Sequence, residues 1–104
     1  KIHTQEVLVD LEGAVAPDYV FENYFNGFSE MMPEYRLISL EELETFLKEN
    51  KHLPNVPSAA TMQQEGISLK EMNLILLQKI EELTLYTLQQ QKEINALKEK
   101  ISEK

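Results

Sequence analysis

The stretch from Ser68 to the C-terminus constrains the fold of this chain more than any other. It reads SLKEMNLILLQKIEELTLYTLQQQKEINALKEKISEK and contains neither proline nor glycine. Beyond Leu69 an apolar residue recurs at alternating steps of three and four, which predicts one helix on the order of 50 Å long. A helix of this length can bury an apolar stripe only against copies of itself, so the pattern predicts assembly.

The seam of the predicted coiled coil follows from a heptad assignment that runs without a break. The a positions are Asn73, Ile80, Thr87, Ile94 and Ile101, and the d positions are Leu69, Leu76, Leu83, Gln90 and Leu97. Ile at a with Leu at d favours two strands, whereas polar layers fit more easily around the wider axis of a trimer. The residues therefore leave dimer and trimer open. Glu93 at g would face Lys98 at the following e position if the helices run parallel.

The two halves of this helix differ in their apolar surface. After about Gln89 only the seam is apolar, but before it further apolar residues lie outside the seam. We expect these to carry a small head, with three residues of an upstream helix and the aromatic residues of the head as the opposite wall. The predicted head-packing residues are Met72, Leu74, Ile75, Leu77, Leu85 and Leu88 on the long helix, and Leu40, Leu43 and Phe46 opposite.

Two shorter helices are predicted upstream, each from a serine cap. Ser39-Leu40-Glu41-Glu42 is a capping box that starts a helix running to about Asn50. Ser58 caps a second helix from Ala59 to Glu65, which Gly66 ends in a left-handed conformation. Between them, residues 52–57 (HLPNVP) predict a rigid extended linker, because two prolines exclude helix.

The N-terminal part shows a different periodicity. Residues 4–12 (TQEVLVDLE) alternate with period two, the pattern of a half-buried strand that Gly13 ends. Residues 19–21 could form a short extended piece, and Asn26-Gly27 could close a small hairpin. The sequence begins within a pattern, so we expect a segment from the C-terminal end of a longer polypeptide.

These elements predict a mainly α fold with a small β portion. It would comprise a short N-terminal strand, a small two-helix head and a long C-terminal helix that forms a parallel coiled coil. The expected division is 1–13 as a strand or the end of a β-structured shaft, 14–67 as an aromatic-rich head, and 68–104 as the coiled coil.

Composition excludes several classes of function. The formal net charge is −8 with a single arginine, Arg36, so neither nucleic acid nor an anionic membrane is an expected partner. There is no cysteine and no apolar run long enough for a membrane span. His3 and His52 lack a ligand partner at a suitable spacing, so no metal site is expected.

No enzyme and no cofactor is predicted either. A Gly-rich phosphate loop, GxSxG and HExxH are all absent from the sequence. Ser58 or Ser68 with a nearby lysine could in principle form a Ser–Lys nucleophile, but a capping role already accounts for both serines.

Three stretches carry a resemblance to a known kind of segment. They read APDYVFENYF, RLISLEELETFLKENKHLPNVPSA and GISLKEMNLILLQKIEELTLYTLQQQKEI, and together they cover nearly all of residues 16–97. The chain resembles the C-terminal segment of repeat-rich bacterial surface proteins and phage tail-fibre-like proteins of the Bacteroidetes type. The resemblance implies a homotrimer at a cell surface or on a virion, in the position where fibres carry trimerisation or intramolecular chaperone domains.

Three functional hypotheses follow from the sequence. The first is a structural module that registers three chains of a fibre. The second is a binding tip that grips a glycan or a protein receptor with exposed aromatic rings. The third is a self-cleaving chaperone. The aromatic residues of the second hypothesis are Tyr19, Phe21, Tyr24, Phe25 and Tyr35, whose simpler role is to fill the core of the head.

Overall fold

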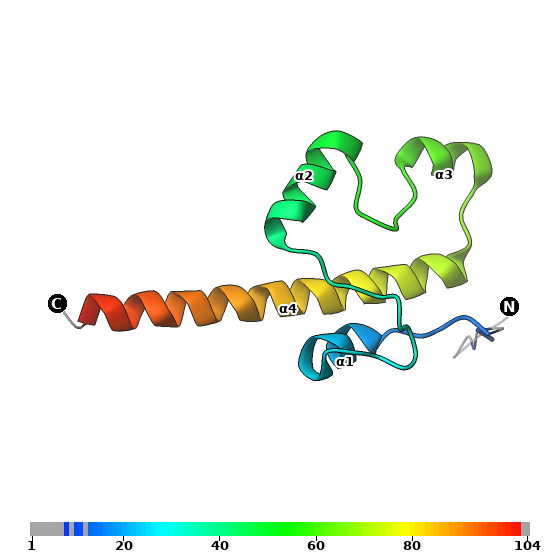
Figure 1. Cartoon of the computed structure of the whole chain (residues 1–104). Coiled ribbons are helices and arrows are strands. Elements are labelled where there is room, and N and C mark those ends of the chain that lie inside the picture. The colour runs from blue at the N-terminus through cyan, green and yellow to red at the C-terminus, as the bar shows by residue number, and fades with distance from the viewer. Residues whose placement is uncertain (1–7, 9, 12, 103–104) are drawn as a thin grey trace, which may run out of the picture.

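The computed structural model describes residues 8, 10, 11 and 13–102, which form an elongated molecule measuring 67 × 34 × 32 Å. The described residues contain four helices, α1 (Tyr19–Asn26), α2 (Leu40–Asn50), α3 (Ala59–Glu65) and α4 (Leu69–Ser102). Helix α4 forms the long axis, and the three short helices lie beside its N-terminal half and middle (Figure 1). The C-terminal part of α4 projects alone.

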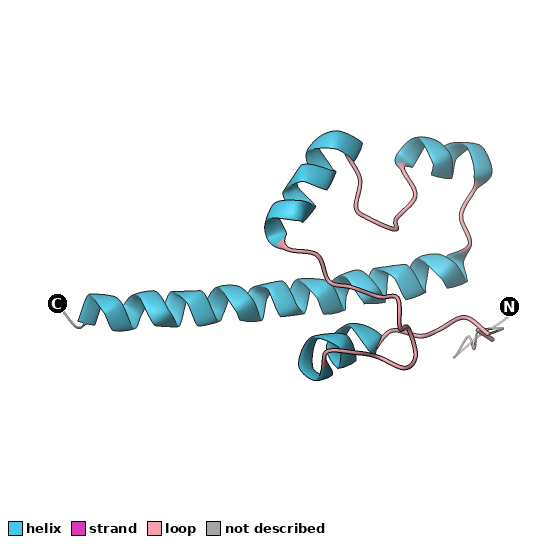
Figure 2. Ribbon diagram, in the orientation of Figure 1, coloured by secondary structure: helices cyan, strands magenta, loops and turns pink. Residues whose placement is uncertain are grey.

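The mainly helical fold class is confirmed, but the small β portion is not found. The described residues form helices, turns and loops without a strand (Figure 2). The strand predicted over residues 4–12 falls largely outside the described part of the chain. The head also contains three short helices where two were predicted.

The additional helix is α1, and it replaces the extended piece and hairpin predicted around Asn26-Gly27. Gly27 adopts φ +81° and donates its backbone N–H to the Asn23 carbonyl, so it ends a helix and not a hairpin. The helix forms because Val20 and Tyr24, spaced by four residues, both turn toward α4 as part of the core. Asn-Gly favours left-handed backbone in either setting, so the local signal was ambiguous.

The serine caps of the other helices are confirmed. The Ser39 hydroxyl accepts from the Glu42 amide at 3.1 Å, and the Glu42 carboxylate accepts from the Ser39 amide at 3.2 Å. Ser58 and Ser68 accept in the same way from the amides of Thr61 and Glu71. The glycine after α3, Gly66, has φ +74° and ψ −173°, a glycine conformation outside the left-handed helical region that was predicted.

The linker between α2 and α3 is a tight turn, not the extended segment that its prolines predicted. The Val56 amide donates to the Leu53 carbonyl at 3.2 Å, and Asn55 adopts φ +64°. Proline at the second position of a turn and asparagine with positive φ at the third suit this geometry. The turn brings Leu53 and Pro54 back toward α4.

The core of the head lies between α1 and the middle of α4. Tyr19, Val20 and Leu85 are its buried centre. Partly buried side chains from α1 and from the segments before and after it surround this centre: Val15, Phe21, Tyr24, Met32, Tyr35 and Leu37. Asn23 ties the loop to α1 by donating from Nδ2 to the Tyr35 carbonyl at 3.0 Å.

Replacing Leu85 tests whether this small cluster holds the head on α4. Leu85 is fully buried, so Leu85→Ala should lower the free energy of unfolding by about 2–5 kcal/mol. Leu88→Ala, on the same helix but 43% exposed, is the matched control and should cost less than about 1 kcal/mol. Urea unfolding followed by circular dichroism measures both, and equal losses would contradict this description of the core.

Candidate oligomerisation face

Helix α4 has two opposite faces with different surroundings. The heptad f positions lie diametrically opposite the a/d seam, and in a simple coiled coil they face solvent. Here two f residues, Gln78 and Leu85, are buried beneath the head. The head therefore occupies the back of α4 and leaves the seam uncovered.

The uncovered face runs along the whole of α4. All ten seam positions are exposed. The aliphatic members are between 46% and 74% exposed, and they are Leu69, Leu76, Ile80, Leu83, Ile94, Leu97 and Ile101. The polar members Asn73, Thr87 and Gln90 are exposed on the same face. An exposed stripe of this length, with seven aliphatic residues among its ten positions, is characteristic of an interaction surface.

Tyrosine hydroxyls attach the head to α4. Tyr19 accepts a hydrogen bond from Gln78 Nε2 at 2.7 Å. Tyr86, from α4 itself, donates to the Ile38 carbonyl at 2.8 Å. Tyr35 donates to the Glu82 carboxylate. Because each bond has a direction, these contacts fix the rotation of the head around α4 more closely than apolar packing alone.

Burial alters the acid–base behaviour of these tyrosines. It raises the pKa of Tyr19 and of Tyr86 above the usual value, and the charge of Glu82 on α4 adds to the effect for both. Burial also raises the pKa of Tyr35, which the hydrogen bond to Glu82 reinforces. The hydroxyls therefore stay protonated and keep their hydrogen bonds throughout the physiological range.

One carboxyl group is buried at the head–helix contact without a cationic partner in the described part of the chain. Glu81 is only 4% exposed, and its Oε1 atom has no hydrogen-bond partner there. Burial raises the pKa of Glu81, and the adjacent Asp18 carboxylate contributes through its charge and a shared hydrogen bond, so that together they bring it to about 7. The nearby Lys79 pairs with Glu82 at 3.1 Å.

The predicted head-packing residues of α4 fall into two groups. Leu85 is buried, and Met72, Leu74 and Ile75 are half-buried. Leu77 and Leu88 remain 43% exposed.

The part of the predicted opposite wall that comes from α2 lies mainly outside the core, whereas the predicted aromatic residues Tyr19, Phe21 and Tyr24 pack in it. Leu40 is exposed, Leu43 is half-buried, and Phe46 packs edge-on against His52 with ring centroids 5.7 Å apart. Val20 and Met32, which sequence reasoning did not select, pack around Leu85 instead. The spacing of Val20 and Tyr24 by four residues was the available signal for this wall.

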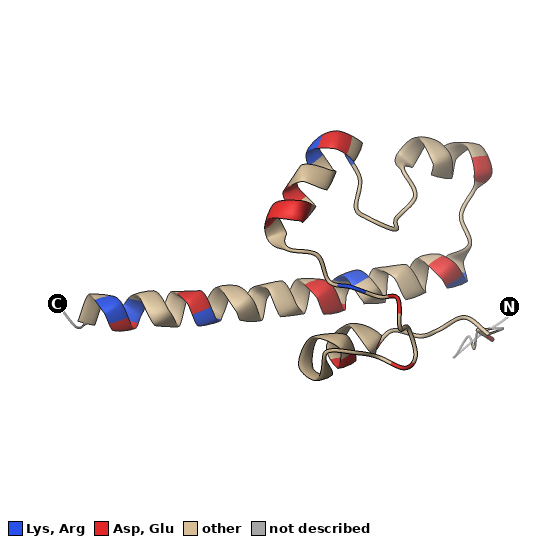
Figure 3. Cartoon of the chain, viewed as in Figure 1, with Lys and Arg blue, Asp and Glu red and all other residues tan. Residues whose placement is uncertain are grey.

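The lower part of α4 has no head around it. From Gln90 to Ser102 every residue is exposed, and the apolar residues of this part are the seam residues and Ala96. Charged residues are absent between Leu83 and Gln91 and reappear at Lys92 and Glu93 (Figure 3). This segment can bury apolar surface only against another chain.

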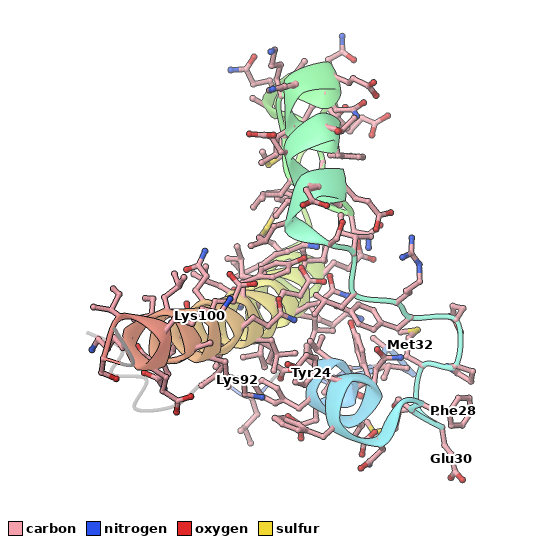
Figure 4. The ribbon with its side chains drawn as sticks, turned by 60° about the vertical axis from the view of Figure 1, so that its left-hand side comes forward. Tyr24, Phe28, Glu30, Met32, Lys92 and Lys100 are labelled. Atoms are coloured by element: carbon pink, nitrogen blue, oxygen red, sulfur yellow. The ribbon has the colours of Figure 1, made fainter. Side chains whose placement is uncertain are left out.

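Most of the aromatic residues predicted for a binding tip pack within the head. Tyr19 is buried, and Phe21, Tyr24 and Tyr35 are half-buried around the core, whereas Phe25 is 64% exposed. Figure 4 shows the neighbouring Phe28 and Glu30 at the outer edge of the head.

In the part of the chain that is described, no cluster of metal-ligating side chains and no membrane-spanning helix is found. His3 lies outside this part, and no three histidine or acidic side chains within it gather closely enough to hold a metal ion. Among the helices given above, none combines the length and apolarity needed to cross a membrane.

The raised pKa of Glu81 predicts a pH-dependent stability. The folded state holds this proton more tightly than the unfolded chain, so the contribution is complete below about pH 4.5 and is lost as the pH rises through about 7. Glu81→Gln keeps a neutral donor beside Asp18, so its stability relative to the parent chain should grow by roughly 1–3 kcal/mol between about pH 5 and about pH 8.

The control for this measurement is Glu99→Gln, an exposed position on the same helix. Urea unfolding at several pH values compares each variant with the parent chain. If the advantage of Glu81→Gln did not change with pH, the assignment of a shared proton to Glu81 and Asp18 would be wrong.

The comparisons with known proteins identify no relative of this chain. No family model, no curated protein and no solved structure matches the chain. The function is therefore argued from the geometry of α4 and its head.

Proposed function

We propose that this chain is an oligomerisation module that registers parallel copies of a fibrous surface or tail-fibre-like protein through α4, with three copies in the assembly and a dimer as the alternative. The observation that carries the proposal is the exposure of all ten seam positions on the face opposite the head. Each large aliphatic side chain gains about 1.5–3 kcal/mol on full burial, so a second copy of the same stripe is its natural cover.

The preference for three chains rests on the polar seam and on the flanks. Thr87 and Gln90 form consecutive polar layers, which a wider three-stranded axis accommodates with water or an ion. Met72 at g and Leu77 at e add apolar surface beside the seam in the first heptads. The resemblance of residues 16–97 to fibre-terminating segments also favours a trimer at an extracellular surface or on a virion.

The preference for parallel chains rests on charge. In a parallel coil Glu93 of one chain faces Lys98 of the next. An antiparallel arrangement would lose this pairing.

The alternative functions have less support. Receptor or glycan binding by exposed rings is supported by Phe25 and Phe28 alone, because the core takes up Tyr19 and Tyr35. Self-cleavage has no free nucleophile among the predicted serines, since Ser58 and Ser68 both cap helices.

A pair of lysine substitutions in the lower half of α4 tests assembly. Ile94→Lys places a charge in the seam and should weaken or abolish association. Ala96→Lys places the same charge two residues away at a c position and should leave association intact. Both sites are exposed in the isolated chain, so neither substitution removes a buried contact of the head.

Light scattering coupled to size-exclusion chromatography gives the mass of each variant over a range of concentrations. We expect a trimer for the parent chain and for Ala96→Lys, with dissociation for Ile94→Lys. A parent chain that stays monomeric at micromolar concentration, or equal behaviour of the two variants, contradicts the proposal.

Cysteine pairing tests whether the helices run parallel. The chain has no cysteine, so Leu97→Cys introduces a single thiol at a d position. In a parallel, in-register coil these thiols meet at the axis and should form interchain disulfides, whereas in an antiparallel coil they lie far apart. Ala96→Cys is the control, since c positions face away from the axis. Non-reducing electrophoresis measures both, and failure of Leu97→Cys to pair would exclude the parallel arrangement.

A further inference from the structure

A small apolar groove lies on one flank of α4, directly beside the seam. Leu53 and Pro54 of the α2–α3 turn and Leu43 of α2 line one side of it, and Leu83 and Tyr86 of α4 line the other. Its volume is about 170 Å³, below the roughly 300 Å³ at which small-molecule sites begin. The groove therefore suits a side chain of a protein partner better than a free ligand.

The groove is continuous with the proposed oligomer interface. Leu83, which forms part of its wall, is a d residue of the seam, and Tyr86 and Lys79 occupy the g positions alongside. The charge of Lys79 is neutralised by Glu82 at 3.1 Å. An approaching neutral surface would thus meet no uncompensated charge at the mouth of the groove.

The opposite flank of α4, formed by the e positions, lacks cover from the head. Leu77 and Thr84 on this flank are exposed. Thr84 donates its hydroxyl to the Ile80 carbonyl at 2.8 Å, which satisfies its polar group and leaves its methyl group for apolar contact. Since residues 83–91 carry no charge, this part of the helix can enter an apolar groove without desolvating an ion.

In a parallel coil the g flank of each helix faces the e flank of the next one. A g residue meets the e residue five positions later on the adjacent chain, so Lys79 lies level with Thr84 and Tyr86 with Gln91. The groove sits between Lys79 and Tyr86, which places Thr84 of the adjacent chain at its mouth.

We propose that this groove is a second contact surface that receives the e flank of α4 from the adjacent copy, centred on Thr84. The proposal rests on the proposed parallel assembly and deepens it, because each head would then hold both its own helix and that of its neighbour. Such a contact joins two different surfaces and closes only when the copies form a ring.

Cross-linking between two differently tagged chains tests the contact directly. One chain carries Leu53→Cys and the other Thr84→Cys, and the purified mixed assembly is treated with a short bismaleimide. We expect a product that contains both tags. The matched control replaces Leu53→Cys by Leu40→Cys, since Leu40 also lies on the α2 side of the head but outside the groove, and its yield should be far lower.

A charge in the groove tests its contribution to assembly. Leu53 and Leu40 are 42% and 41% exposed in the single chain. We therefore expect Leu53→Asp and Leu40→Asp to change the stability of the head by similar amounts. Leu53→Asp should raise the concentration of half-dissociation roughly tenfold or more, and Leu40→Asp should leave it nearly unchanged. Sedimentation velocity over a dilution series provides the measurement.

The outcomes separate this inference from the function on which it rests. An assembled parent chain that gives no 53–84 product, or equal behaviour of the two aspartate variants, overturns the groove contact and leaves the coiled coil standing. A parent chain that never assembles overturns both. Loss of helical circular dichroism in Leu53→Asp but not in Leu40→Asp would show that the groove belongs to the core of its own chain, and it too would overturn the inference.

Discussion

The packing of Leu85 against Tyr19 and Val20 is the contact on which the rest of the structure depends. Leu85 occupies an f position, which in a simple coiled coil would point into solvent, and here it is fully buried. Because f lies opposite the seam, this one contact sets the head on the back of α4. A head centred one residue earlier or later would lie about 100° around the helix and cover one flank of the stripe. The exposed seam therefore follows from where the head is attached.

Polar groups make this attachment specific. Gln78, Glu81 and Glu82 face the head, and the hydroxyls of Tyr19 and Tyr35 reach across to two of them. A purely apolar contact would tolerate rotation of α1 around α4, whereas directional hydrogen bonds do not. Glu81 is the exception. Its burial between the head and α4 raises the pKa of its carboxyl group, so ionisation of this carboxyl weakens the packing of the head on α4.

Local signals in the sequence were sufficient for the helices that begin with serine. The caps at Ser39, Ser58 and Ser68 depend on residues within one turn, and the helices that begin after Ser39 and Ser58 end as predicted. The missed features depend on distant residues. Asn26-Gly27 is equally suited to a hairpin and to a helix end, and only the packing of Val20 on Leu85 decides between them. Similarly, the contact of Tyr35 with Glu82 joins segments whose sequences show no sign of each other.

Two of the three polar layers of the seam, Thr87 and Gln90, lie where the head ends. Above Thr87 and Gln90, the apolar layers at Leu76, Ile80 and Leu83 have the head on the opposite face; below them, Ile94, Leu97 and Ile101 belong to a helix that is otherwise bare. In the assembly that we propose, the lower layers can associate before the head has folded, since they need nothing but a second helix. The upper layers are different, because the groove beside Leu83 exists only once α2 and its turn are in place. The polar layers at Thr87 and Gln90 then divide α4 into two segments. The lower segment brings the chains into register, and the upper segment couples assembly to the folded head.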